Sequence, residues 1–136
     1  MSSFKIFDIA GSGMSAQSLR LNVTASNLAN ADSISGNVAG VYKAREPVFS
    51  AVMDKLAGDD AASVRVLGVV ENDAPVQSRY EPGHPLADAQ GYIYLPNVNV
   101  VEQMANMISA SRSYQNNVEV MNASKQLLLA TLRLGQ

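Results

Sequence analysis

The 136-residue chain has no cysteine, no tryptophan and a single histidine. The lack of cysteine excludes a disulfide framework and a thiolate metal site. His84 lies in a segment rich in Pro and Gly, with no second histidine, so the pattern favours a surface turn over a catalytic base or a metal ligand. The carboxylates fall mainly in segments predicted to be loops, where turn formation explains them. We therefore expect no enzyme activity, no cofactor and no metal.

Charge is also scarce. Charged residues make up 16% of the chain, against about 25% in a typical globular domain. The ten basic residues are scattered from Lys5 to Arg133 and are balanced by twelve acidic ones, a pattern that argues against nucleic acid as a partner. A surface with few ions can be buried against neighbours without leaving charges unpaired.

Long apolar runs are missing as well. The longest unbroken aliphatic runs are short, such as Leu127 to Ala130. Their length is far below the roughly 20 residues of a membrane-spanning helix. Lys5 and Asp8 interrupt the N-terminal stretch from Met1 to Ala16, which lacks a continuous apolar core of signal-peptide length. We expect no direct membrane insertion, and export, if it occurs, by a route that leaves the N-terminus uncleaved.

An apolar row is present near the N-terminus. Phe7, Met14, Leu21 and Leu28 recur every seven residues, a spacing that places them along one side of a helix. Beside them runs a row of small residues, namely Gly11, Ser18 and Ala25. Glycine, serine, threonine and asparagine in the same stretch each cost a few tenths to about 1 kcal/mol of helix stability relative to alanine. This helix is predicted to need a packing partner.

The C-terminal third carries two interleaved heptad rows. One row contains Val100, Met107, Tyr114, Met121 and Leu128, and the other contains Met104, Ser111, Val118, Lys125 and Leu132. This spacing is typical of a coiled coil. Pro96 precedes the pattern, Asn99 with Glu102 resembles a capping box, and Gly135 suits the far end. The pattern predicts a helix over about 98–133, roughly 50 Å long at ~1.5 Å per residue.

Between the two helices the residues change to β-branched and aromatic types separated by turn formers. The predicted strands are Val41 to Phe49, Ser63 to Val70, Val76 to Tyr80 and Tyr92 to Leu95. Turns are predicted at 58–60, 71–75 and 81–85, where Gly, Asp, Asn and Pro cluster. The fold class is therefore α+β and mainly helical, with long terminal helices packed as a coiled coil and a small central β insertion. The predicted divisions are 1–34, an N-terminal helix; 35–96, a central loop and β region; and 97–136, a C-terminal helix.

The apolar rows exceed what the modest central region can cover. Burying each Leu- or Met-sized side chain contributes roughly 2 kcal/mol, whereas ordering each helical residue costs about 1–2 kcal/mol. One pair of helices leaves much of each helix in water, so packing among many subunits is predicted to supply the remaining contacts. Uncharged amides on both helices are suited to bonding across helix interfaces, although solvated faces explain any single Asn equally well.

Three stretches carry a resemblance to a known family. Residues 18–32, SLRLNVTASNLANAD, are similar to the signature of rod and hook subunits, the axial proteins of the bacterial flagellum. The segment 80–88, YEPGHPLAD, with Gly91 and Tyr92, and the helix segments 109–115 and 117–122 resemble the proximal rod proteins of that family. One departure is the run Ser33-Ile34-Ser35-Gly36, where many relatives have Thr-Pro-Gly-Tyr. The resemblance covers nearly the whole chain.

The resemblance implies a structural subunit of the proximal rod, assembled through its terminal helices into a hollow tube that transmits motor torque. It implies export by the flagellar type III apparatus to a periplasmic rod. The implied partners are copies of itself, other rod proteins, the adaptor between rod and MS ring, and the export gate, with no nucleic acid and no small-molecule substrate. The residues expected to pack subunits are Phe7, Met14, Leu21, Asn27, Leu28, Asn30, Val100, Met104, Met107, Tyr114, Val118, Met121, Leu128 and Leu132.

Two other classes stay open at this point. A coiled-coil component of another type III secretion apparatus would share the helices but not the match over Tyr80 to Tyr92. A small enzyme with a site in the β segment is the weaker alternative. Gly11-Ser12-Gly13 superficially resembles a phosphate-binding loop, but no strand precedes it and no P-loop lysine follows in place.

Overall fold

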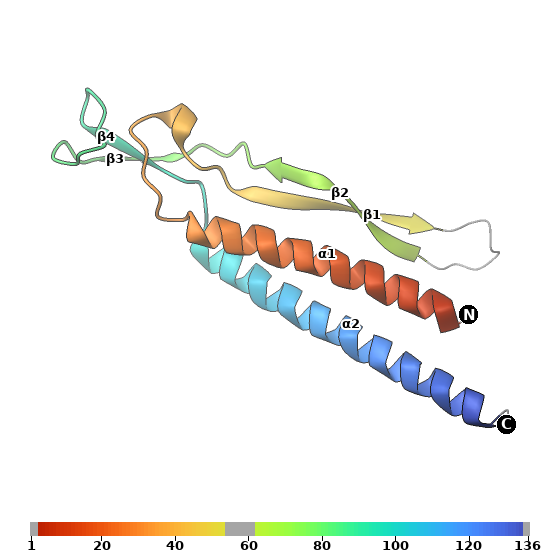
Figure 1. The fold of residues 1–136 in the computed structure, drawn as a ribbon. Helices are drawn as coiled ribbons and strands as arrows, with labels where there is room; N and C mark the ends of the chain where they lie inside the picture. Colours follow the sequence, from red (N-terminus) through yellow and green to blue (C-terminus); the bar gives the residue numbers. More distant parts are fainter. Residues whose placement is uncertain (1–2, 54–61, 135–136) are drawn as a thin grey trace.

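The computed structural model describes residues 3–53 and 62–134. Two long helices dominate it, α1 (Ser3–Ala29) and α2 (Val100–Leu134), and they lie side by side in opposite directions, so that both chain termini are at the same end (Figure 1). The antiparallel order also follows from paired residues, since Arg20 bonds to Asn106 and Asn27 to Gln103. None of the described helices is long and apolar enough to cross a bilayer.

Two small antiparallel sheets make up the β part. The first is a hairpin of β1 (Arg45–Met53) and β2 (Ala62–Glu71), which lies along α1 on the side away from α2 (Figure 1). The second pairs β3 (Gln77–Tyr80) with β4 (Tyr92–Leu95) and projects beyond the end of the helix pair. A single 3-10 turn, η1 (Val38–Gly40), precedes β1. The fold class is therefore α+β, as predicted.

The strand predictions are confirmed except at the first strand. It begins at Arg45 rather than at Val41, because the Ala44 N–H donates to the Asn97 side chain and not to the facing strand, although the Asn72 N–H still donates to the Ala44 carbonyl. It also continues past Phe49 to Met53. A bulge between Val48 and Phe49 leaves Leu67 without a partner, and Gly68 beside it has a φ of +157°, which side-chain-bearing residues rarely adopt.

The start of α2 follows the predicted cap. Oδ1 of Asn99 accepts the backbone N–H groups of Val101 and Glu102, at 3.1 and 3.3 Å. These are two of the N–H groups at a helix start that have no partner inside the helix, so Asn99 acts as the N-cap of α2. The turn predicted at 58–60 and the predicted terminator Gly135 lie outside the described residues.

Residues 33–36, where the sequence differs from many relatives by lacking proline, are held by contacts with the second sheet and its loop. Ser35 forms an isolated bridge with Tyr94, in which each backbone N–H donates to the other residue's C=O. Gly36 passes so close to the loop after β3 that a Cβ there would collide with the carbonyl oxygen of Leu86. Residues 33–41 therefore run beside the small sheet of β3 and β4.

Candidate subunit-packing surface

The centre of the contact between α1 and α2 is formed by small and polar side chains. On α2, Gln103, Ala110 and Ser124 are buried, and Asn117 in the same heptad row contacts α1. On α1, the buried residues include Ala10, Ala16, Thr24 and Asn27. A Cβ on Gly13 would lie 2.8 Å from Nδ2 of Asn117, so glycine at this position allows the close approach.

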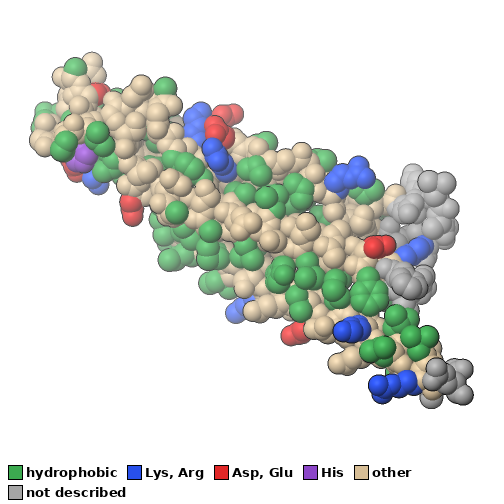
Figure 2. All heavy atoms as spheres, viewed as in Figure 1, with side chains coloured by type: hydrophobic (Ala, Val, Ile, Leu, Met, Phe, Trp, Pro, Cys, Tyr) green, Lys and Arg blue, Asp and Glu red, His purple; other side chains and the backbone are tan. Residues whose placement is uncertain are grey.

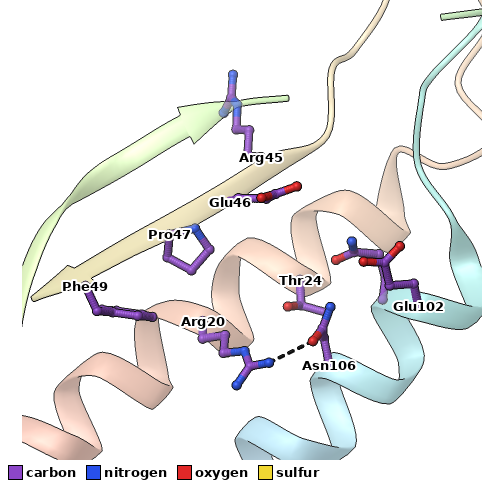
Figure 3. Close-up of a pocket in the computed structure, with 9 residues that line it drawn as sticks. Arg20, Thr24, Arg45, Glu46, Pro47, Phe49, Glu102 and Asn106 are labelled. Atoms are coloured by element: carbon purple, nitrogen blue, oxygen red, sulfur yellow. Dashed lines mark hydrogen bonds between the residues drawn. The ribbon is translucent and has the colours of Figure 1, made fainter. Parts of the chain in front are cut away.

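A polar groove of about 310 Å³ lies where β1, α1 and α2 meet (Figure 3). The Arg20 side chain projects from α1 into this groove and donates to Oδ1 of Asn106 at 2.7 Å. Glu46 and Phe49 of β1 and Glu102 of α2 form its walls. Charges of both signs line the groove.

Asn27 is the most highly connected side chain of the helix pair. Its Nδ2 donates to the Arg45 carbonyl at 2.8 Å and to Oε1 of Gln103 at 3.1 Å, while its Oδ1 accepts the Arg45 N–H and the Tyr42 hydroxyl, each at 2.9 Å. The Tyr42 proton is thereby used, so the Ser26 hydroxyl donates to the Tyr42 oxygen at 3.2 Å. All four bonding positions of the amide are filled, and the side chain is 1% exposed.

The predicted packing residues of α1 fall into two groups. Phe7, Met14, Leu21 and Leu28 are half-buried in the single chain. Asn27 is buried inside the chain, so any effect of this residue on subunit packing has to be indirect. Asn30 is half-buried and donates to the Ser26 carbonyl of its own helix.

The predicted packing residues of α2 are exposed or half-buried in the single chain. Met104 is 54% and Leu132 62% exposed, and Val100 is 39% exposed. The other five are half-buried, namely Met107, Tyr114, Val118, Met121 and Leu128.

Further apolar side chains that were not predicted add to this surface. Val101 and Ile108, in the first turns of α2, are 77% and 56% exposed, and Leu127 near its end is 70% exposed. Figure 2 shows apolar side chains gathered over the first turns of α2 and again near its C-terminal end. Exposed apolar patches of this kind mark interaction sites in soluble proteins. Val101 and Ile108 are seven residues apart, so their spacing on one side of a helix could have been found in the sequence.

The row at the centre of the helix contact was also missed. Gln103, Ala110, Asn117 and Ser124 are seven residues apart, so their spacing was visible in the sequence. Small and polar residues do not register as a packing face when apolar character is the criterion. Gly11, Ser18 and Ala25, the small row predicted on α1, lie on a more open face: Ser18 and Ala25 are exposed, and nothing lies within 4 Å of a Cβ built on Gly11.

The loop between β3 and β4 is organised by Asp88. Its Oδ1 accepts the N–H groups of Gln90 and Tyr92, each at 2.9 Å, and its Oδ2 accepts the Tyr94 hydroxyl at 3.0 Å. The Tyr92 N–H is the main cause that holds the pKa of Asp88 below its ordinary value, and the hydrogen bond to Asp88 raises the pKa of Tyr94.

The same loop also contains His84, the only histidine of the sequence, and a glycine with a positive φ. Nδ1 of His84 accepts the Leu86 N–H, as expected of a turn residue. Gly91 has a φ of +85°, and a Cβ there would meet the Tyr80 ring.

Sites for other chemistry are not assembled in the part of the chain that the structure describes. No group of three or more His, Cys, Asp or Glu side chains there is placed to hold a metal ion. Gly11-Ser12-Gly13 lies inside α1, and the Ser12 hydroxyl donates to the Ile9 carbonyl and accepts the Val64 N–H of β2. The segment is therefore part of a helix that contacts the hairpin.

Two family models match the two ends of the chain. Residues 7–36 match the flagella basal body rod protein model, and residues 89–134 match the C-terminal model of the flagellar basal body rod FlgEFG proteins. The first match covers most of α1, and the second covers β4 and α2. The class of protein is thus that of the flagellar basal-body rod proteins.

Full-length relatives define the class further. The flagellar basal-body rod protein FlgC of Salmonella typhimurium is 54% identical over 136 residues, with all of both chains covered. The FlgC of Yersinia enterocolitica is 53% identical with the same coverage, and the FlgC of Buchnera aphidicola from Acyrthosiphon pisum is 40% identical over 138 residues, again covering all of both chains. The chain belongs to the FlgC family of flagellar basal-body rod proteins.

This family membership confirms the resemblance drawn from the three sequence stretches. It places the chain among structural proteins of the flagellar rod and not in an enzyme class. The full-length matches also favour the rod over a component of another type III secretion apparatus.

Proposed function

We propose that this chain is a structural subunit of the proximal rod, which builds a hollow tube with its neighbours and passes motor torque along it. One observation supports the proposal above the others. The two helices pair through small and polar side chains, and large apolar side chains of α2 such as Val101, Met104 and Leu132 stay exposed. Transfer of each such side chain from water into an interface contributes roughly 2 kcal/mol, which favours assembly.

The proposed contacts between subunits have coiled-coil character. The exposed α2 residues at positions 104 and 132 belong to one heptad row, with half-buried Val118 between them. The open small row of α1, at Gly11, Ser18 and Ala25, offers a shallow surface that a neighbour's helix can approach closely. Large side chains of one subunit and small ones of another would then interdigitate as knobs and holes. Contacts between unlike surfaces of identical subunits generate open helical assemblies, as a rod requires.

The proposed partners are other rod proteins, further copies of this chain, and the adaptor that joins the rod to the MS ring. We further propose that the flagellar type III apparatus exports the chain through its gate to the periplasm, without cleavage of a signal peptide. Catalysis, a cofactor and a small-molecule substrate have no place in this proposal. The family membership supports the rod assignment, whereas the particular neighbours and the export route are inferences.

The experiment uses a strain that lacks the gene and is complemented with variants. Met104→Glu with Ile108→Glu places two carboxylates in the exposed apolar patch of α2, and Gln115→Glu with Asn122→Glu adds the same charge at two exposed polar positions of that helix. We expect the first variant to lose swimming and to be absent from purified basal bodies, while the second retains both. Normal amounts of the first variant in basal bodies would sink the proposal.

A second measurement concerns the state before assembly. If packing between subunits supplies much of the stability, the isolated chain should be incompletely helical by far-UV circular dichroism and monomeric by sedimentation. A fully helical and stable monomer would contradict the coupling between folding and assembly.

A further inference from the structure

The start of β1 is held on two sides by amide side chains from the ends of both helices. Asn27, near the end of α1, bonds to both the N–H and the C=O of Arg45. Asn97, just before α2, accepts the Ala44 N–H at 2.8 Å. Gln103 of α2 accepts from Asn27. We call Asn27, Asn97 and Gln103 the amide node.

We propose that the amide node couples two events, the pairing of α1 with α2 and the attachment of the β1–β2 hairpin, so that neither forms fully without the other. Asn27 acts toward Arg45 as a neighbouring strand would, because it both donates to and accepts from one residue. Its second donor hydrogen reaches only Gln103, on the other helix. Since the side chain is 1% exposed, water cannot replace a lost partner.

Asn97 extends the same connection to the second strand. Its Nδ2 donates to the carbonyls of Asn72 and Ala74, which follow β2, at 3.0 and 2.8 Å. The Asn72 N–H in turn donates to the Ala44 carbonyl at 2.7 Å. The roots of both strands are therefore tied to the segment that leads into α2. Every side chain of the node is an uncharged amide, so the connection does not depend on ion pairing.

The alternative is that each amide stabilises only its immediate surroundings. The two accounts differ for Gln103, which is bonded to Asn27 but to no residue of the hairpin. Coupling requires that truncation of Gln103 loosens the hairpin where it contacts α1 far from the node, at the bond between Val64 and Ser12. It also requires that Tyr42→Phe, a change beside the root of the hairpin, loosens the helix pair at Gly13 and Asn117.

The lack of cysteine in the chain allows a direct test by disulfide cross-linking. The pair Ser12→Cys with Val64→Cys reports attachment of the hairpin, and the pair Gly13→Cys with Asn117→Cys reports pairing of the helices. Each pair is combined with Gln103→Ala, Gln103→Glu or Tyr42→Phe, and the fraction oxidised within the chain is read on non-reducing gels of purified basal bodies. Ser33→Ala is the matched control, because the exposed Ser33 hydroxyl donates only to the nearby Asn30 carbonyl.

We expect Gln103→Ala and Tyr42→Phe each to lower both cross-links at least threefold. Gln103→Glu keeps an oxygen for Asn27 and should retain more of both cross-links than Gln103→Ala, and Ser33→Ala should change neither by more than twofold. If Gln103→Ala lowers only the helix cross-link, or Tyr42→Phe only the hairpin cross-link, the coupling is refuted. Failure of either cysteine pair to oxidise without a further substitution also overturns it, because the assembled arrangement then differs from this one.

The inference depends on the proposed function only in that basal bodies are the place of measurement. Measuring the same cross-links in the purified full-length chain, oxidised in solution, tests the coupling separately from the proposed function. Absence of every variant from basal bodies, with the expected pattern in solution, would count against the rod assignment and for the node.

Discussion

The two ends of the molecule are held by different kinds of contact. At one end, where α1 stops, α2 starts and β3 and β4 project, side chains such as Asn27, Asn97 and Asp88 each make three or more hydrogen bonds to other parts of the chain (Figure 1). We call this the root end. At the other end both termini lie, and α2 exposes Leu127 and Leu132, 70% and 62% exposed. We call this the terminal end.

The difference shows which part of the structure the single chain specifies by itself. A hydrogen-bonded amide has fixed partners and directions, so the root end has one arrangement in isolation. Apolar burial has no direction and needs only a surface of sufficient area, which other subunits can supply. The root end therefore sets the subunit's shape, and the apolar area for assembly lies at exposed positions along α2, from Val101 and Met104 near its start to Leu127 and Leu132 at the terminal end.

Substitution of Asn27 should have the largest effect on the single chain. Asn27→Ala leaves the N–H and the C=O of Arg45 and the Tyr42 hydroxyl without this partner, and an unsatisfied group costs about 1–3 kcal/mol where it is buried. We expect a loss of roughly 3 kcal/mol. Urea unfolding followed by near-UV circular dichroism measures it, because four of the five tyrosines lie at the root end, at 42, 80, 92 and 94.

Asn30→Ala is the control for that measurement, since its side chain bonds only to its own helix and should cost less than about 1 kcal/mol. Equal losses for the two variants would remove the special role of the root end.

A glycine at the root end provides the next test. Gly36→Ala puts a methyl group against the Leu86 carbonyl oxygen, which is backbone and cannot turn aside. We expect a loss of about 1–3 kcal/mol, as for overpacked sites in general. In the same region Gly83 has open space where a methyl group would lie, so Gly83→Ala should be close to neutral. Thermal melts of both variants give the comparison, and similar midpoints would show that residues 33–41 do not pack tightly on the loop.

The pH dependence of the root end follows from Asp88. Because hydrogen bonds, first of all from the Tyr92 N–H, hold its pKa below the ordinary 3.8 in the folded state, the unfolded chain takes up the proton first as pH falls. The stabilisation is therefore complete above the unfolded value and is lost as pH falls through the folded pKa. Urea midpoints from pH 6 to 2 should decline less in Asp88→Asn than in the unsubstituted chain. Parallel curves would contradict this role.

A matching effect of opposite sign belongs to Tyr94, whose pKa is raised by its bond to Asp88. Its contribution is complete below the ordinary value of 10.0 and is lost as pH rises through the folded pKa. Urea midpoints above pH 10 should therefore decline less with rising pH in Tyr94→Phe than in the unsubstituted chain.

The smallest effect on stability is expected at the terminal end. Leu132→Ser removes a side chain that is 62% exposed, and such surface changes stay within about 0.5 kcal/mol. Swimming should nevertheless fall in a complemented strain, because the same side chain is proposed to pack between subunits. A plate assay and a urea curve on one variant separate the two readouts. A large loss of single-chain stability with normal swimming would show that Leu132 stabilises the single chain and does not act in assembly.

Much of the local structure could be predicted because it depends on short-range patterns. The capping of α2 by Asn99 requires only an asparagine at the right distance from the first helical turn. The pair β3 and β4 follows two short β-branched and aromatic segments separated by turn formers. The first strand was displaced by four residues because Ala44 is held by Asn97, 53 residues away in the chain, and no local pattern contains that contact.

The packing residues were predicted less completely, for a different reason. Apolar periodicity selected Met104 and Leu132, which are exposed in the single chain, but it did not select Val101, which lies on another side of α2 and is the most exposed apolar residue of its first turns. The family motif gave Asn27 a packing role between subunits, which stays a prediction, and in the structure the bonds of Asn27 connect parts of one chain. Amide side chains serve equally in solvent and in a buried network, so their type alone does not tell which.

The order of the residues by itself determined that two long helices flank a β insertion, since helix and strand periods differ and can be read directly. It also carried the motifs of the rod family at both ends. Only the tertiary structure decided which stripe of α2 faces α1. Close approach of two backbones depends on the fit of Gly13 to Asn117 and of Asn27 to Gln103, contacts between residues that lie far apart in the chain. Large apolar residues of α2 such as Val101 and Met104 stay exposed beside this closer fit of small and polar groups.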